Sequence, residues 1–443
     1  MGFFDRLFGK NIESRSQPDI RFGRYSDSYK DPDNYDAWDR ALDKFEKDAY
    51  LDSFRQFFRY LRDEDEDNVQ WEEEEDVIRF DLFQGSKKIT GVADTVKLKA
   101  EAKIAQAKVL NVGFMRRLIE KNFQLKYSRF ALDPENNISI VFDTYALDGS
   151  PYKLYYALKE LATNADKQDD LLLDEFEVLN SIETSHLSDL PGEEKEIKYD
   201  FIKKKIEDVL HEVGEGNLDQ SQYPGGIAYL LLDLVYKLDY LIRPEGYMME
   251  TLERIHRLYF SKDSRSTAHK NQLLCKQLQE LIDRPKTDFF KEMYLTTSTF
   301  GITTPVNHDR IVGFIDGELG HMDWYEENNH PAIALAVPGY IVGYCMFNYA
   351  VPRPDRDLFH LYYQIMEPEY FRKLGFTPQY YHPESGKFEK RAIVRAIERI
   401  AAENRDRFYK MKPATRSLRY ESPTSFAKSF LMMVKGLDLT KVE

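Results

Sequence analysis

Three of the Glu-x-x-His motifs in this sequence are the parts best suited to do chemistry. Two of them, Glu253–His256 and Glu318–His321, fall in segments with helical spacing, where a carboxylate and an imidazole three residues apart share one face. In di-iron helix bundles, two such motifs and one glutamate from each of two other helices hold the metal ions. Glu292 or Glu398 could supply the further carboxylates, although the pattern does not select them. The third motif, Glu183–His186, lies in a polar segment that cannot contribute to a bundle core.

Chance accounts for much of this signal, because glutamate is common in the chain. A helical carboxylate-bridged metalloenzyme is therefore kept as the alternative hypothesis. Its ligands would be Glu253, His256, Glu318 and His321.

Other catalytic patterns are missing from the sequence. It contains no glycine-rich phosphate-binding motif and no Gly-x-Ser-x-Gly motif. Its two cysteines, Cys275 and Cys345, are too few for a disulfide framework or a cysteine-rich zinc site. We therefore assign no catalytic, cofactor-binding or metal-binding residue from sequence, and we expect no cofactor.

Composition limits the classes of partner. The 443 residues include 62 Lys and Arg against 76 Asp and Glu, for a net charge of -14. Affinity for duplex nucleic acid depends mostly on basic residues that neutralise phosphates, so this balance argues against a general nucleic-acid binder. A hydrophobic fraction of 42% with 31% charged residues is typical of a soluble globular protein.

Two segments bear on membranes. Residues 332–351 carry no charge and are long enough to span a bilayer, but Pro338 lies in their centre, which favours a buried helix kinked or divided at that proline. At the N-terminus, Phe3, Phe4, Leu7 and Phe8 recur at helical spacing, which is compatible with a short anchor or with a tail docked on its own domain. We expect a cytoplasmic protein without stable membrane insertion.

The chain divides into four parts by composition and periodicity. We predict a tail and linker over residues 1–36, an α+β domain over 37–182, a linker over 183–198 and a mostly helical domain over 199–443. The run from Asp63 to Asp76, with ten carboxylates in fourteen residues, is expected to be a solvated loop or flank.

The α+β domain is predicted from alternating patterns. A helix of about 25 residues begins at Ala37. The clearest strand is 96–104, where small and aliphatic residues alternate with charged ones, so one face of its sheet is dry, the other wet, and the sheet antiparallel. Further strands are expected at 78–82, 129–132 and 138–142, and further helices at 112–123 and from Pro151, where Leu171 to Ile182 continue the helical spacing.

The C-terminal part shows no convincing strand. Helices are predicted at 199–213, 226–242, 247–260, 268–282, 288–297, 309–325, 331–351, 355–374, 386–406 and 424–434.

Three short segments of the α+β region resemble the YbjN family, whose fold is similar to that of class I type III secretion chaperones. They are Phe114–Asn122, Arg129–Asp133 and Asp169–Leu172, within a likeness that covers about residues 37–180. The resemblance implies a protein-binding domain without catalytic residues that pairs with itself or with another protein. We therefore expect a non-enzymatic, chaperone-like adaptor with a protein partner, and possible homodimerisation.

Overall fold

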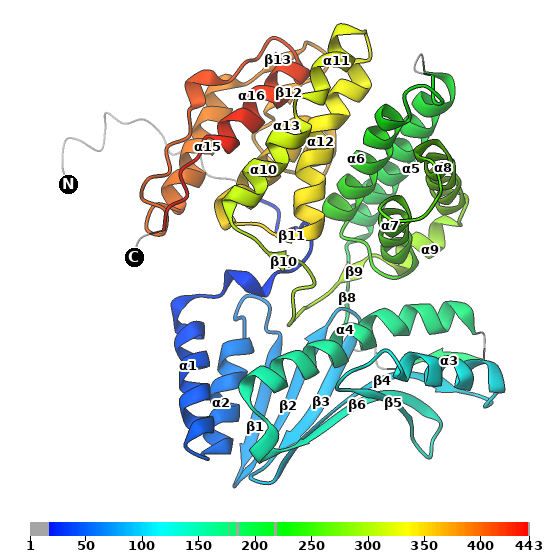
Figure 1. Ribbon diagram of the computed structural model, residues 1–443, viewed down its shortest axis with the longest axis vertical. Coiled ribbons are helices and arrows are strands. Elements are labelled where there is room, and N and C mark those ends of the chain that lie inside the picture. Colours follow the sequence, from blue (N-terminus) through cyan, green and yellow to red (C-terminus); the bar gives the residue numbers. More distant parts are fainter. Residues whose placement is uncertain (1–16, 177, 183–185, 217–218, 442–443) are drawn as a thin grey trace.

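The computed structural model describes residues 17–176, 178–182, 186–216 and 219–441, except for the side chains of 169–171, 174 and 175. The amphipathic tail around Phe3–Phe8 and the first three residues of the motif Glu183–His186 lie outside the described residues. Figure 1 shows a curved sheet flanked by helices below a larger group of helices. The expected fold class, an α+β N-terminal region followed by a mostly helical one, is confirmed.

The N-terminal part is built on one antiparallel sheet of seven strands. Its order is β1-β2-β3-β4-β6-β5, and β7 pairs with the end of β4. The strands are β1 Val69–Glu74, β2 Val77–Gln84, β3 Lys87–Ala93, β4 Lys97–Ala107, β5 Arg129–Leu132, β6 Asn137–Tyr145 and β7 Leu179–Ser181.

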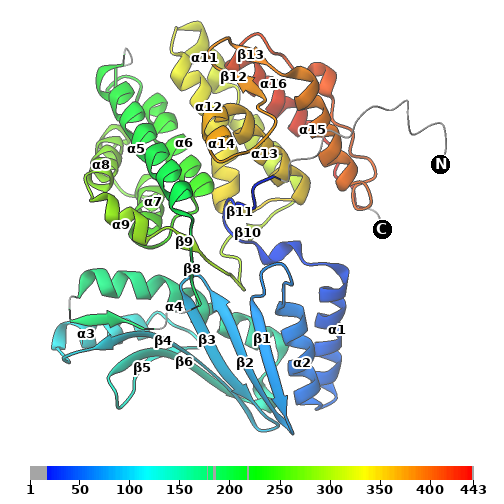
Figure 2. The same cartoon turned by 180° about the vertical axis from the view of Figure 1, so that it is seen from behind.

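The central strand β4 confirms the predicted dry and wet faces. Leu98, Ala102 and Ile104 are fully buried, whereas Lys97 and Lys99 are exposed. Helix α4 (Pro151–Glu175) covers the dry face. Figure 2, from behind, shows the other face of the sheet without a covering helix.

Helix α4 begins where capping chemistry predicts. The Ser150 hydroxyl accepts a hydrogen bond from the amide of Lys153, and Pro151 occupies the first helical position. The predicted stripe of Leu154, Ala157, Leu158, Leu161 and Ala165 is fully buried.

The helix predicted over 37–61 is wrong in its extent, because the chain forms two helices there. Helix α1 (Pro32–Glu46) starts five residues before the predicted Ala37, because Pro32 suits the first turn of a helix. The Asn34 side chain also accepts a hydrogen bond from the amide of Asp31. Helix α2 (Tyr50–Leu61) follows a break at Asp48, whose backbone is left-handed with φ 56°.

The acidic run and the end of α4 also differ from expectation. Six of the fourteen residues of the run Asp63–Asp76 form the edge strand β1, whose Glu73 pairs with Arg55 of α2. The segment 179–181, expected to continue the helix, instead pairs with β4 as β7, because an exposed edge of β4 offers its backbone groups there.

Helix α3 (Val112–Asn122) follows β4, and the Asn111 side chain caps it by accepting the amide of Phe114 at 3.0 Å. Its Phe114 and Leu118 are buried in the core of the sheet domain. The β5 strand comes directly after it and pairs with β6 over the predicted residues.

The C-terminal part is a helical assembly around α6 and α12. Its helices are α5 Gly192–Glu215, α6 Pro224–Ile242, α7 Gly246–Tyr259, α8 Thr267–Ile282, α9 Lys286–Lys291, α10 His308–Glu318, α11 His321–Glu327, α12 Pro331–Asn348, α13 Arg353–Met366, α14 Pro368–Lys373, α15 Lys390–Glu403 and α16 Pro423–Lys435. Among its described residues, strands reach only two residues each.

Several predicted helices have different limits. Helix α5 begins at Gly192, inside the predicted linker 183–198. The predicted helix 309–325 is two helices, because the chain turns at Gly320, and 355–374 is two because Pro368 cannot continue α13. The predicted helix 288–297 ends at Lys291, and the chain after it is extended.

Helix α12 is the buried central helix predicted for 332–351. It continues through Pro338 without a division. By length and hydropathy it could cross a membrane, but two-thirds of its residues are buried within the helical domain. This burial is that of a helix in the core of a folded domain.

One segment of the helical half belongs to the core of the sheet domain. We call residues 296–303 the arm. Phe300 of the arm is buried among N-terminal residues, with its ring centroid 5.6 Å from that of Tyr155, and its amide donates to Gln84. The arm also bonds through Thr299 to the carbonyls of Asn68 and Phe83.

Because Phe300 is buried in the core of the sheet domain, we predict that Phe300→Ala leaves a cavity there. This substitution should lower the free energy of unfolding of the sheet domain by about 3–5 kcal/mol. Ile302→Ala, at an exposed position of the same arm, should change it by less than about 0.5 kcal/mol. Urea unfolding monitored by circular dichroism measures both, and equal losses would contradict the role of the arm.

Candidate functional site

The junction between the two halves holds a network of interacting charges beside a cavity. Three features form the junction: the arm, the contact between α4 and α7, and residues 18–30, which we call the strap. The strap was predicted to be part of a linker. It instead lies against both halves, because its side chains find buried partners in each.

Arg24 of the strap is the centre of the junction. Its Nε and Nη2 donate to the two carboxylate oxygens of Asp239 on α6 at 2.9 and 2.7 Å, and its Nη1 donates to Glu253 on α7 at 3.1 Å. The guanidinium also lies 4.0 Å from the ring centroid of Phe347 on α12. Burial alone would lower the pKa of Arg24, but the two carboxylates outweigh burial and raise it. Arg24 thus remains charged and joins three helices.

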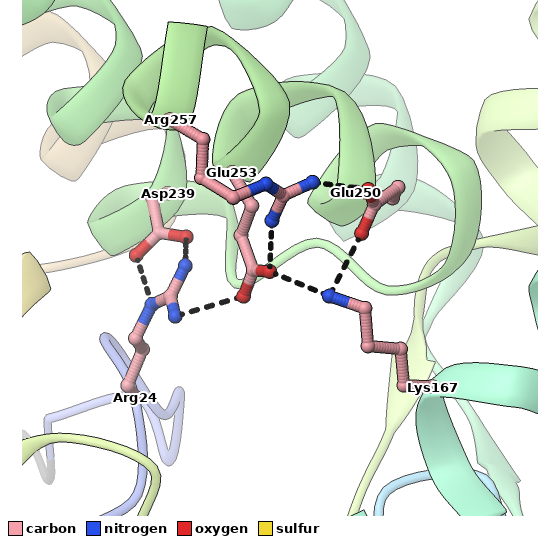
Figure 3. A network of polar contacts seen from close by, with 6 residues as sticks. All are labelled: Arg24, Lys167, Asp239, Glu250, Glu253 and Arg257. Atoms are coloured by element: carbon pink, nitrogen blue, oxygen red, sulfur yellow. Dashed lines mark hydrogen bonds and ion pairs between the residues drawn. The ribbon is translucent and has the colours of Figure 1, made fainter. Parts of the chain in front are cut away.

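Lys167 extends this network to the sheet domain (Figure 3). Its Nζ lies 3.1 Å from carboxylate oxygens of both Glu250 and Glu253. Arg257 contacts the same two glutamates from α7. Burial would raise the pKa of Glu253, but Arg24 and Lys167 outweigh it and hold that pKa below its usual value.

Phe22 fills an aromatic pocket next to Arg24. Its ring centroid lies 5.1 Å from His360, 5.3 Å from Phe371 and 5.7 Å from Phe376. Between Phe22 and Arg24, the amide of Gly23 donates to the carbonyl of Tyr240 at 2.8 Å.

The rest of the strap contacts the sheet domain and α13. The Tyr25 hydroxyl donates to Asp63, and the Tyr29 ring lies beneath Arg356, 4.6 Å from its guanidinium. Lys30 donates to the carbonyl of Leu61, and burial lowers the pKa of Lys30 to about 8.

A cavity of about 1370 Å³ opens beside the strap, between α1, α2, α13 and α15. Both signs of charge line it. Its basic residues include Arg40, Arg59, Arg62, Arg353, Arg356 and Arg399, and its acidic ones include Asp63, Glu64, Asp65, Glu66 and Glu403. Such a mixed lining suits a polar surface of a partner better than a single small anion.

The structure places the predicted motif residues around α6 but in two separate positions. His256 Nδ1 lies 2.8 Å from the hydroxyl of Tyr236, and His321 Nδ1 lies 2.7 Å from that of Tyr229. Tyr229 and Tyr236 are seven residues apart, about 10.5 Å along a helix. Glu318 accepts a hydrogen bond from Tyr229 at 2.6 Å, whereas Glu253 faces Arg24 and Lys167.

This arrangement gives no ligand set for a bridged metal. Within the described residues, no group of three or more His, Cys, Asp or Glu side chains could hold a metal ion. Glu253 contacts three cations, and Glu292 pairs with Arg284 and accepts the amide of Met248. Glu398 is exposed on α15. The metalloenzyme alternative therefore has no geometric support in the described part of the chain.

Neither cysteine is set up as a nucleophile. Both thiols are free, and burial raises the pKa of Cys275 to about 11. Burial raises the pKa of Cys345 further. A thiolate, the reactive form, is thus disfavoured at both positions.

Sequence reasoning missed the strap, whose only local signal is an aromatic residue, a glycine and an arginine in succession within a polar segment. Its partners Asp239 and Glu253 are 215 and 229 residues away. Hydrophobic periodicity does not indicate which charged residues pair across such a separation in the sequence.

Comparison with known proteins assigns no family to this chain. No family model matches the chain, and no curated protein matches it with significant similarity.

Two neutral histidines beside the strap predict acid sensitivity. Burial and the nearby Arg24 lower the pKa of His256 to about 4, although Glu253 opposes this. Burial and Arg356 lower the pKa of His360 to about 4. In the unfolded chain the two imidazoles become protonated near pH 6.5, whereas in the folded chain they become protonated only near pH 4. Acid therefore favours the unfolded chain, and the stability present above pH 6.5 is lost as the pH falls toward 4. Urea unfolding from pH 7 to 4.5 should show this loss, and the variant H256F/H360F should show a smaller one.

Arg24 and Lys167 should differ in their effect on stability. Arg24→Met leaves Asp239 buried without its cation, so we expect a loss of about 3–5 kcal/mol in the free energy of unfolding. Lys167→Met removes a partly exposed ammonium, so the loss should be below about 1 kcal/mol. Chemical denaturation at pH 7 compares the two, and a larger effect of Lys167→Met would contradict the central position of Arg24.

Proposed function

We propose that this protein is a non-enzymatic, cytoplasmic adaptor of the chaperone-like type, and that helix α3 and the segments beside it bind a protein partner. The observation that carries the proposal is an exposed apolar stripe on α3. Val112, Ile119 and Phe123 are 84%, 67% and 95% exposed. Monomeric surfaces rarely leave such side chains together in water.

The stripe has the spacing of a helix-binding face. Residues 112, 119 and 123 lie seven and four positions apart, which places them on one side of the helix. Phe114 and Leu118, on the opposite side, are buried in the core. Helix α3 is thus apolar on both sides, and only one side has a partner within the described residues. Exposed Val109 and Leu110 lie just before it.

Charge around the stripe selects the kind of partner. Residues 108–129 include six basic residues and one acidic residue, in a chain with a net charge of -14. An acidic amphipathic segment of another protein would match both the apolar stripe and this local positive charge. The basic residues are Lys108, Arg116, Arg117, Lys121, Lys126 and Arg129.

The open face of the sheet offers a second, polar contact area. A groove of about 950 Å³ crosses strands β1 to β6 on this face. Its charges alternate in sign, with Arg79 and Lys99 near Glu72, Asp81 and Asp143. A mixed polar face of this kind suits the rim of a protein interface better than a catalytic pocket.

The likeness of Phe114–Asn122 to the YbjN family supports the same proposal, since that segment contains most of α3. A domain of that type binds another protein or a second copy of itself. The expected adaptor function and homodimer are both compatible with an apolar α3.

The test is the double variant I119E/F123E. It should lose at least 90% of the protein captured from the native lysate, because two buried carboxylates at the interface are costly. The matched control is Leu147→Glu, at a position of the same domain that is also well exposed. It should capture the same proteins as the unmodified chain.

Gel filtration with light scattering shows whether the partner is a second copy, in which case I119E/F123E is monomeric. Capture that is unchanged in I119E/F123E, with no change in mass, would contradict the proposal. Binding to anionic vesicles that depends on Ile119 and Phe123, without any protein partner, would also contradict it.

A further inference from the structure

The strap lies in a groove of the helical domain as a bound peptide would. Its residues 22–24 cross the surface formed by α6, α7, α13 and α14. The backbone bond from Gly23 to the carbonyl of Tyr240 sets the position, and the side chains on each side enter separate sites. This surface is distinct from α3, so the two binding sites can be tested separately.

Each of the three strap positions is selective for its residue. Phe22 enters the aromatic pocket around His360 and Phe371. Gly23 has φ 71°, and a Cβ there would lie 2.6 Å from a ring carbon of Tyr240, so any residue with a side chain would be strained at this position. Arg24 makes a bidentate pair with Asp239 that requires a planar guanidinium. The groove is therefore selective for a peptide with an aromatic residue, a glycine and a cation in succession.

The chain contains this pattern a second time. Phe8-Gly9-Lys10 repeats the order aromatic residue, glycine, cation of Phe22-Gly23-Arg24, fourteen residues earlier. A lysine is a point charge and cannot make the bidentate pair, so the earlier copy should bind more weakly than the strap. A weaker second ligand on the same chain is suited to exchange with the first.

We propose that the groove is a recognition site for Phe-Gly-cation peptides, and that residues 7–10 of the same chain are its second ligand, which replaces residues 21–24. Covalent attachment keeps the second ligand at a high effective concentration.

Exchange would release the strap from the helical domain. The tether between the groove and Lys30 would lengthen by fourteen residues, or about 46–50 Å when extended. Of the contacts between the two halves described above, those of the arm and of Lys167 would remain. The exchange therefore couples occupancy of the groove to the number of contacts that tie the two halves together.

The experiment replaces Phe8 by the photoreactive analogue p-benzoylphenylalanine in the full chain. In the background F22A/R24A, which empties the groove, illumination should cross-link position 8 to peptides that contain His360 or Phe371. The yield should be at least tenfold above that in the chain with an intact strap. Adding Gly9→Val, which cannot adopt a positive φ without strain, should remove these cross-links.

A milder background covers the case in which F22A/R24A does not fold. Arg24→Lys keeps the charge and makes the strap chemically similar to residues 8–10, so the cross-link yield should rise severalfold above that of the unmodified strap. Circular dichroism confirms folding in each background.

Three outcomes would overturn the proposal. Cross-links spread over the surface would show that residues 7–10 have no site. Cross-links that persist with Gly9→Val would show that the groove does not read the glycine. Groove cross-links found only between two copies, at twice the chain mass, would show that the ligand is not in the same chain.

Discussion

The buried pairing of Arg24 with Asp239 and Glu253 is the interaction on which the rest of the junction depends. A guanidinium removed from water is costly unless carboxylates and hydrogen bonds compensate it, and here α6 and α7 supply both. Once Arg24 is held, Gly23 and Phe22 are positioned against Tyr240 and the aromatic pocket. The neighbouring cation Lys167 then finds its glutamates on the same helix face. One ion pair thereby determines how the strap lies across the helical domain.

Helix α6 is the element that the helical domain is organised around. Its tyrosines 229, 236 and 240 each bond a histidine from a different helix, in α11, α7 and α13. Its acidic residue Asp233 pairs with Lys237, which also reaches Glu367. These contacts are polar, and all except that of Tyr229 with the exposed His321 are at least partly buried. The motif histidines that suggested metal chemistry serve here to fix helix positions.

The two halves of the protein contribute differently to the proposed adaptor role. The junction is extensively bonded by the strap, the arm and Lys167, so it holds the two domains in a defined relation. Helix α3 is remote from the junction in Figure 1 and presents apolar side chains outward. A protein that joins a fixed frame to an apolar docking helix is suited to bringing partners together.

Local patterns in the amino-acid sequence account for several helices and strands, whereas the long-range contacts depend on the tertiary fold. The alternation in 96–104, the stripe of α4 and the cap at Ser150 depend on neighbours within a few residues, so their patterns are visible in one chain. The break at Asp48 and the strand β7 depend on competition between local propensity and a distant surface. Arg24 of the strap is the extreme case, because its partners Asp239 and Glu253 lie more than 200 residues away. Glu253 meets an arginine and a lysine where its spacing with His256 suggested a metal. Hydrophobic periodicity reports which face is buried, but it carries no information on which distant charge will be its neighbour.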